Sequence, residues 1–318
     1  MSMTNQPTQI FDGNAESGIN LAIQNLRNNL LIGLPTETVY GLAALASSRL
    51  AIAKIFKVKK RPTNHPLILH LASYADLDKW TVNVPEYART LCNAIWPGPL
   101  TVILQRSKNV CDEITGFRET VAVRVPNHRV ALKLLRELDD GLVAPSANRF
   151  GKVSPTTAQH VVDDLGSDVS LVLDGGVCSV GVESTILDCT LSTPQILRYG
   201  AVTTEQIKSI CEIDIDLSTG ESRASGMLEK HYAPKCRVEL AETSDQAQTI
   251  LNSLIQNGLT ARVLDYSSDV IFYAQELYAS LRRADSLNID VVVAVMPPNY
   301  GLGVAIRDRL TKASTATH

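Results

Sequence analysis

The sequence predicts an α/β fold in two parts: a larger mixed sheet with helices, followed by a small βαβαβα unit. Over residues 1–212, short apolar runs mix irregularly with helical patterns, which is typical of a sheet that is not purely parallel. Residues 213–236 show no convincing periodicity and are interpreted as a linker, and a regular alternation of strands and helices fills residues 237–318. With 318 residues and 45% hydrophobic content, the chain can bury two cores.

Strands of the first part are predicted from apolar runs bounded by proline, glycine or polar residues. In chain order these runs are 30–34, 66–71, 100–104, 120–125, 142–144, 171–174, 184–188 and 196–199. Helices are predicted from apolar residues at helical spacing and from capping residues. They cover 18–28, 48–57, 73–80, 85–95 and 127–138, and a further helix is expected to start with Ser154 as its cap.

The last part is predicted from its regular alternation alone. Its strands are expected at 237–240, 261–264 and 290–295, and its helices at 244–256, 270–284 and 303–312. Three strands and three helices make a unit that is too short to be a separate enzyme of full size.

The segment 35–42 reads PTETVYGL and follows an apolar strand. Its proline cannot donate to a sheet ladder, so the strand is expected to stop there. One interpretation is a strand followed by a helix that Thr36 or Thr38 caps. The other is a polar strand end that forms one wall of a binding site.

A run of cations, Lys59-Lys60-Arg61, closes the helix 48–57. Cations at the end of a helix offset the negative pole of its dipole. The same cations suit a triphosphate, because Arg presents a planar fork and Lys a compact charge. The sequence leaves both interpretations open.

Other polar residues stand at strand ends or inside strands. Arg124 interrupts the apolar run 120–125, where it either points to solvent or can bind a carboxylate. Ser146 and Asn148 follow the next strand, in a turn that supplies hydroxyl and amide groups. The glycine-rich connections near 174–185 match neither a P-loop nor a G-x-G-x-x-G pattern.

Several classes of protein are disfavoured. The net charge of −3 argues against a surface built throughout for nucleic acid. The N-terminus does not have the pattern of a signal peptide, and no stretch has the length of a membrane span. The six cysteines form no C-x-x-C pair. A cytoplasmic protein with reduced thiols is therefore expected. His65, His70 and His231 lack zinc spacing, and no covalent nucleophile is evident. This inventory suits a nucleotide and a small polar substrate.

These motifs, in this order, resemble those of the threonylcarbamoyl-AMP synthase family in its long two-domain form. The matching segments are 35–42 (PTETVYGL), 59–62 (KKRP), 66–70 (PLILH), 96–102 (WPGPLTV), 120–126 (TVAVRVP), 144–148 (APSAN), 154–156 (SPT), 181–185 (GVEST), 196–200 (ILRYG), 231–234 (HYAP) and 301–310 (GLGVAIRDRL). The resemblance implies a YrdC-like twisted mixed sheet with helices around a concave cleft, and a small Rossmann-like βαβ C-terminal domain.

The resemblance also implies an activity. The family forms threonylcarbamoyl-adenylate and pyrophosphate from L-threonine, bicarbonate and ATP, for the N6-threonylcarbamoyladenosine at position 37 of tRNA. The product is expected to pass to a tRNA threonylcarbamoyl transferase complex, and direct binding of tRNA stays open. Mg²⁺ is expected to be held through phosphates, with no metal site on the protein.

Carried over residue by residue, the resemblance assigns two neighbouring sites. The L-threonine site would be lined by Thr36, His70, Arg124, Ala144 and Ser184. The ATP site would involve Arg61, His65, Thr120, Ser146, Asn148, Ser154, Arg198 and Tyr232, with Lys59 and Arg61 as the catalytic cations. Tyr232, on the linker, would close over the nucleotide.

The chain departs from the family in two places. His65 stands where the family usually has Asn, and the linker has Ser225-Gly226-Met227 and Lys230-His231-Tyr232 where Pro-Gly-Met and Arg-His-Tyr are usual. The sequence leaves two other functions open: a non-catalytic RNA-binding factor that uses a basic surface around 57–61, and a carbamoyl-transfer module for another acceptor.

Overall fold

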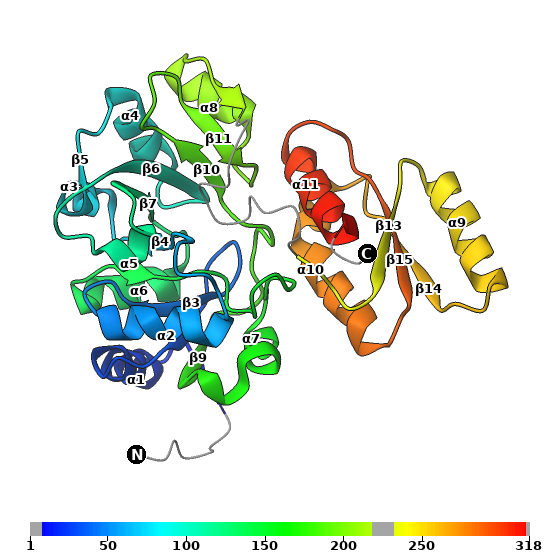
Figure 1. The fold of residues 1–318 in the computed structure, drawn as a ribbon, viewed down its shortest axis with the longest axis horizontal. Helices are drawn as coiled ribbons and strands as arrows, with labels where there is room; N and C mark the ends of the chain where they lie inside the picture. Colours follow the sequence, from blue (N-terminus) through cyan, green and yellow to red (C-terminus); the bar gives the residue numbers. More distant parts are fainter. Residues whose placement is uncertain (1–7, 218–231, 316–318) are drawn as a thin grey trace.

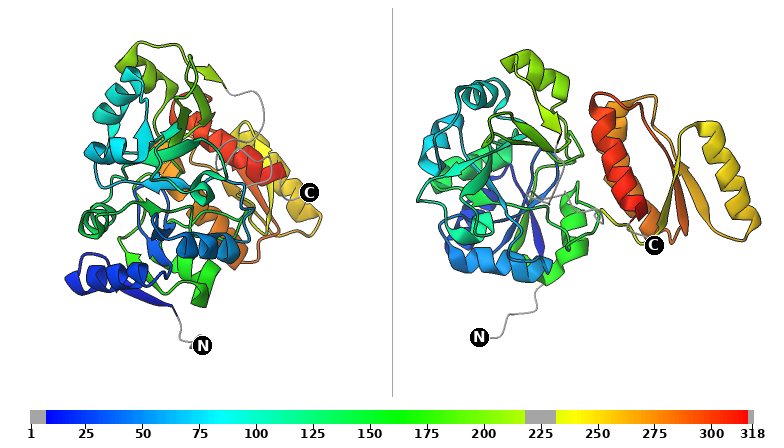
Figure 2. Two further views of the ribbon diagram at one scale, coloured as in Figure 1. Left: turned by 60° about the vertical axis from the view of Figure 1, so that its left-hand side comes forward. Right: turned by 45° about the horizontal axis from the view of Figure 1, so that its top comes forward.

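A computed structural model describes residues 8–217 and 232–315 (Figure 1). It contains two sheets, each with its own helices, in two bodies that lie side by side (Figures 1 and 2). The predicted α/β class is confirmed, because the larger sheet has helices around it and contains both parallel and antiparallel strand pairs.

The larger sheet crosses the whole first body. In spatial order its strands are β1 (Gln9–Asp12), β9 (Leu171–Asp174), β2 (Ile32–Leu34), β3 (Gly41–Leu45), β8 (Leu142–Val143), β4 (Ile68–His70), β7 (Thr120–Arg124), β6 (Leu100–Arg106), β10 (Thr185–Asp188), β11 (Gln195–Arg198) and β12 (Asp216–Leu217), and β5 (Thr81–Val82) pairs with β6. Strands distant in the sequence are thus neighbours, which brings their ends and loops together.

Helices cover this sheet through their apolar faces. They are α1 (Glu16–Arg27), α2 (Arg49–Lys59), α3 (Leu77–Trp80), α4 (Glu86–Ile95), α5 (Asp112–Thr115), α6 (Arg129–Leu138), α7 (Ala158–Leu165) and α8 (Thr204–Cys211), with short 3₁₀ turns η1 (Tyr74–Asp76) and η2 (Gly166–Asp168). α1 and α6 share one apolar cluster with β2, whereas α2, α4 and α7 contribute to the main core. Successive residues of β4 and β7 enter different clusters, as the alternation of a buried strand requires.

The second body is a three-layered α/β unit. Its parallel strands lie in the order β13 (Arg237–Ala241), β15 (Val291–Val295) and β14 (Ala261–Leu264). α9 (Ser244–Gln256) covers one face, and α10 (Val270–Ser286) and α11 (Leu302–Thr315) lie on the other, toward the first body (Figure 1).

Three local predictions were wrong. No helix follows Pro35: β2 and β3 pair antiparallel with Leu34 opposite Gly41, and the Thr36 hydroxyl accepts from the amides of Thr38 and Val39, which closes a tight turn. Ser154 does not cap a helix, because α7 begins later and Thr157 caps it. Asn127, the expected cap of the helix 127–138, does not cap it, because α6 begins at Arg129 and the ring of His128 accepts from the amide of Val130.

The predicted linker is described only at its ends. Asp216–Leu217 form β12 beside β11, and the description resumes at Tyr232. The departures from the family pattern between 225 and 231 lie outside the described residues. In the part of the chain that is described, no helix is long and apolar enough to cross a membrane.

Candidate functional site

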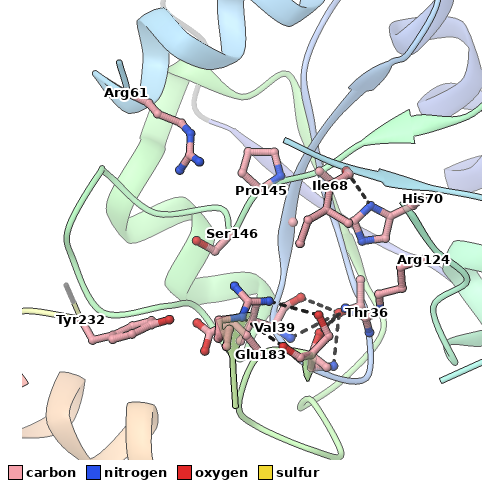
Figure 3. Close-up of a pocket in the computed structure, with 15 residues that line it drawn as sticks. Thr36, Val39, Arg61, Ile68, His70, Arg124, Pro145, Ser146, Glu183 and Tyr232 are labelled. Carbon is pink, nitrogen blue, oxygen red and sulfur yellow. Dashed lines mark hydrogen bonds between the residues drawn. The ribbon is translucent and has the colours of Figure 1, made fainter. Parts of the chain in front are cut away.

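A pocket opens on the large sheet where connections from distant parts of the sequence meet (Figure 3). Its walls come from the β2–β3 connection, β4, the end of β7, and the loops that follow β8 and precede β10. The residues that line it are Thr36, Thr38, Val39, Gly41, Arg61, Ile68, His70, Arg124, Ala144, Pro145, Ser146, Glu183, Ser184, Arg198 and Tyr232.

Strand register explains why His70 and Arg124 reach this pocket together. β4 and β7 run parallel with Ile68 opposite Ala122 and His70 opposite Arg124. Because alternate side chains of a strand share a face, all of these point to one side, whereas Leu69 enters the main core. Arg124, whose direction the sequence left open, is 3% exposed and lines the pocket.

A buried ion pair fixes the polar connection between β2 and β3. A guanidinium nitrogen of Arg124 lies 2.5 Å from a carboxylate oxygen of Glu37, and both side chains are 4% exposed. Arg124 also donates to the hydroxyl of Thr38 at 2.9 Å and to the carbonyl of Gly98 at 3.3 Å. The Thr38 hydroxyl is 2.9 Å from that of Thr36, so the ion pair sets the place of Thr36 in the pocket.

Tyr40 ties the same connection to a glycine-rich turn. Its hydroxyl donates to the carbonyl of Gly176 at 2.7 Å and accepts from the amide of Gly175 at 3.1 Å. A Cβ on Gly175 would stand 2.4 Å from the His128 ring and 2.7 Å from Pro35. Gly175 therefore serves close packing, whereas Gly176 serves the turn through its φ of +87°.

The cationic run does not form a basic surface. Lys59 and Arg61 are 2% and 7% exposed, and Lys60, which is exposed, stands between them in a left-handed conformation with φ of 54°. Arg61 lines the pocket, and burial together with the nearby charge of Arg198 lowers its pKa to about 10. The RNA-binding alternative loses its main support, because two of the three cations face inward.

Lys59 and Asn148 lie behind the pocket wall. The ammonium of Lys59 donates to the carbonyls of Ser146 and Asn148, at 2.5 Å each. Burial, and then the charge of Arg61, lowers the pKa of Lys59 well below its usual value. The Asn148 amide donates to the carbonyls of Arg149 and Lys152. These two side chains shape the loop that presents Ser146.

Two other expected ATP contacts, His65 and Thr120, lie outside the pocket lining. The ring of His65 meets Phe150 edge-on with centroids 5.6 Å apart, and Phe150 also lies under the Arg61 guanidinium at 5.7 Å. Thr120 begins β7 opposite Gln105. His65 is thus placed beside the cationic end of the pocket, and Thr120 is four residues before the pocket-lining Arg124.

Ser184 and Arg198 form a bonded pair in the wall. Arg198 donates through Nε to the carbonyl of Ser184 at 3.0 Å and through Nη2 to its hydroxyl at 3.1 Å. Thr101 adds a contact of 2.7 Å to the same hydroxyl. Burial lowers the pKa of Arg198.

Glu183 is the carboxylate of the lining, and it already has partners. Ser154 donates to its Oε1 at 2.7 Å, and Arg309 donates to its Oε2 at 3.0 Å. Burial raises the pKa of Glu183, but the charges of Arg309 and Arg198 outweigh that effect and lower it to about 2. Tyr232 stacks on Tyr278 with ring centroids 5.6 Å apart and lines the same side of the pocket.

The arrangement offers binding groups and no obvious covalent chemistry. Figure 3 shows Thr36, His70 and Arg124 at one end, Arg61 and Tyr232 at the other, and Ser146 between them. Among the described residues, no group of three or more His, Cys, Asp or Glu side chains is placed to hold a metal ion. Such a pocket suits a small amino acid at one end and an anion at the other.

Comparison with known proteins agrees with this geometry. Residues 24–200 match the Sua5/YciO/YrdC family model, described as telomere recombination, and residues 202–315 match the threonylcarbamoyl-AMP synthase C-terminal domain. The threonylcarbamoyl-AMP synthase of Pyrococcus abyssi is 39% identical over 93% of this chain and 94% of its own. The chain belongs to the threonylcarbamoyl-AMP synthase family.

A second threonylcarbamoyl-AMP synthase and a solved structure extend the match. The enzyme of Bacillus subtilis is 38% identical over 91% of this chain and 90% of its own. The crystal structure of P. abyssi Sua5 complexed with L-threonine superposes with a TM-score of 0.90 at 36% identity, over 98% of this chain and 97% of that one. The predicted family and its YrdC-like fold are therefore confirmed.

Sequence reasoning left three residues of this threonylcarbamoyl-AMP synthase site without a role. Glu37 and Thr38 hold Arg124, and Glu183 joins the pocket wall to the second body. The signal for Glu37 was a carboxylate in an otherwise buried segment, which requires a cation nearby. For Glu183 the partner lies 126 positions away in the sequence, so no local pattern identifies it.

The protonation of His70 gives a test of the buried site. Burial and the charge of Arg124 lower the pKa of His70 to about 3, so the unfolded chain binds a proton near pH 6.5 that the folded chain does not. Stability is therefore lost as pH falls below 6.5. Between pH 7.5 and 5 this loss is about 2 kcal/mol, and His70→Gln should remove it from urea unfolding curves. Other titratable groups contribute equally to the wild type and to His70→Gln. If the free energies of unfolding of the two proteins changed with pH in parallel, the His70 ring would not be buried and neutral.

The role of Lys59 behind the wall gives a second test. Lys59→Met leaves the carbonyls of Ser146 and Asn148 without their donor. We expect the free energy of unfolding to fall by about 2 kcal/mol, measured in urea. Lys57→Met, on the exposed side of the same helix, is the matched control and should change stability by less than about 0.5 kcal/mol. Equal stability of the two variants would mean that Lys59 does not support the loop.

Proposed function

We propose that this chain is a threonylcarbamoyl-AMP synthase that makes threonylcarbamoyl-adenylate and pyrophosphate from L-threonine, bicarbonate and ATP. The observation that carries the proposal is one continuous pocket with an amino-acid end and a cationic end. The relative from P. abyssi was crystallised with L-threonine. The product would serve the N6-threonylcarbamoyladenosine at position 37 of tRNA, through a transferase complex that receives it.

The threonine end is formed by Thr36, His70, Arg124, Ala144 and Ser184, all of which line the pocket. Arg124 binds the carboxylate of threonine, because its guanidinium is held in place by Glu37 and Thr38 before the substrate arrives. His70 stays neutral at physiological pH, so it can form a hydrogen bond to the substrate without adding charge.

The ATP end is formed by Arg61, Ser146, Arg198 and Tyr232, which line the pocket. Lys59 and Asn148 support the loop of Ser146, Ser154 bonds to Glu183, and His65 shares Phe150 with Arg61. Thr120 begins β7, outside the lining. Arg61 and Arg198 are the cations that face the phosphates. Lys59 acts by holding the loop of Ser146, which is a supporting role in place of the direct catalytic role that the sequence suggested.

The reaction needs positioning and charge stabilisation. The amine of threonine forms a bond to the carbon of bicarbonate, water leaves, and a carbamate results. A carbamate oxygen then forms a bond to the α-phosphorus of ATP, and the bond to pyrophosphate breaks. Arg61 and Arg198 are bonded to their own chain, so they offset the developing negative charge with little rearrangement.

Magnesium is best treated as part of the nucleotide substrate. Glu183, the carboxylate of the lining, is occupied by Arg309, Tyr278 and Ser154, so the described residues do not fit a protein cage for the ion. Mg²⁺ would be held by phosphate oxygens and water. It would supply charge neutralisation on the phosphates.

The activity is tested with the purified chain, ATP, bicarbonate and a single amino acid. We expect pyrophosphate release and an adenylate product with L-threonine, and neither when threonine or bicarbonate is omitted. Amino acids without the hydroxyl and methyl groups of threonine should give far less product. Pyrophosphate release that does not depend on threonine would instead favour transfer to another acceptor.

The division of the pocket is tested by Arg61→Ala. Because Arg61 faces the phosphates, the KM for ATP should rise about tenfold or more, whereas the Kd for threonine should change by less than about threefold. Both are measured on the purified protein, by steady-state kinetics and by calorimetry. Lys60→Ala, the exposed neighbour, is the control and should change neither constant. An equal loss for both ligands would reject the assignment of Arg61.

A further inference from the structure

The loop 181–185 lies between the pocket and the second body. Glu183 and Ser184 line the pocket, and the Glu183 carboxylate also bonds to Tyr278 of α10 and to Arg309 of α11. The C-terminal motif GLGVAIRDRL belongs to α11 and the turn before it, and the proposed function leaves its role open. The contacts between this loop and α11 indicate what that motif does.

Both oxygens of the Glu183 carboxylate are bonded. Oε1 accepts from Ser154 at 2.7 Å, and Oε2 accepts from Tyr278 at 2.8 Å and from Arg309 at 3.0 Å. Glu183 is 6% exposed and Arg309 1% exposed. A buried carboxylate needs such partners, and two of the three are supplied by the C-terminal unit.

The backbone of the loop is also fitted to that unit. Gly181 has a φ of +82°, and a Cβ built on it would stand 2.3 Å from the carbonyl oxygen of Ala274 and 2.5 Å from the Cα of Gln275. Glycine is therefore required where the loop meets α10. Gln275 adds a hydrogen bond to the carbonyl of Ser179.

Contacts lead from Arg309 to the substrate groups. Arg309 donates to the carbonyl of Tyr199, next to Arg198, and its guanidinium lies 5.2 Å from the ring centre of Tyr232. Arg198 in turn holds the carbonyl and hydroxyl of Ser184. Glu183 thus directly precedes the pocket residue Ser184 in the chain, and its charge interacts with that of the pocket residue Arg198.

We propose that Arg309 and Tyr278 are positioning residues for the active site, so that the C-terminal unit completes the wall that binds threonine and ATP. The proposal rests on the proposed function for its link to catalysis. Arg309 neutralises Glu183 and thereby leaves Arg198 for the phosphates and for Ser184. Without Arg309, Glu183 loses its ion-pair partner, so its charge acts more strongly on Arg198 and draws that guanidinium away from the substrate.

The test uses the full chain and the variant Arg309→Met, which keeps the bulk of the side chain and removes its charge. We expect the KM for ATP and the Kd for threonine to rise about tenfold. Hydrogen exchange of the 181–200 segment should become faster without any ligand present. The double variant Glu183→Gln with Arg309→Met removes both charges, and it should recover most of the affinity that the single variant loses.

The matched control is Arg307→Met on the same helix, because Arg307 pairs with Glu242 and donates to the carbonyl of Pro297, both within the C-terminal unit. It should leave affinity and exchange unchanged. If Arg309→Met fails to fold, Tyr278→Phe removes one bond to Glu183 and should give an effect of about threefold. The proposal is overturned if exchange and affinity in Arg309→Met match the control, or if the double variant recovers nothing. A wild-type chain that makes no adenylate rejects the proposed function, while the exchange experiment still decides the role of Arg309.

Discussion

Buried cations are the constraint on which this structure depends. Lys59, Arg61, Arg124, Arg198 and Arg309 are all less than 8% exposed. A charge removed from water is tolerated only where carbonyls, hydroxyls or carboxylates replace its hydration. The loops around the pocket have the shapes that provide those acceptors. The pocket is thus a consequence of satisfying these charges as much as of the sheet that carries them.

The same constraint explains how binding groups can be ready before a substrate arrives. Arg124 is anchored by Glu37 and by the carbonyl of Gly98, and Arg198 by Ser184. Each guanidinium retains a fixed direction, so little conformational entropy remains to be lost on binding. Because Glu37 also neutralises the charge of Arg124, selectivity at that end depends more on the direction of the guanidinium than on total charge.

Part of this arrangement could be predicted from the sequence and part could not. The sheet and the C-terminal unit follow from periodicities that hold over several residues, whereas the direction of Arg124 is decided by the pairing of β7 with its neighbours. The turn after Pro35 could not be predicted, because a threonine that caps a helix and one that closes a turn have the same local sequence. Lys59 and Arg61 are buried while Lys60, in a left-handed conformation between them, is exposed, and the pattern Lys-Lys-Arg does not reveal this difference. The pairing of Glu183 with Arg309 is set by tertiary structure alone.

The contact between the two bodies combines apolar groups, which favour association, with charged groups, which fix the relative position. Val39, Val153 and Val182 of the first body join Tyr273 and Leu277 of the second in one apolar cluster. Such contacts favour association but have little directional preference. The bonds to the Glu183 carboxylate are directional, so they select one position among those that bury the same area. Val39 belongs to the β2–β3 connection and lines the pocket. The segment that carries Thr36 therefore rests on the sheet on one side and on the C-terminal unit on the other.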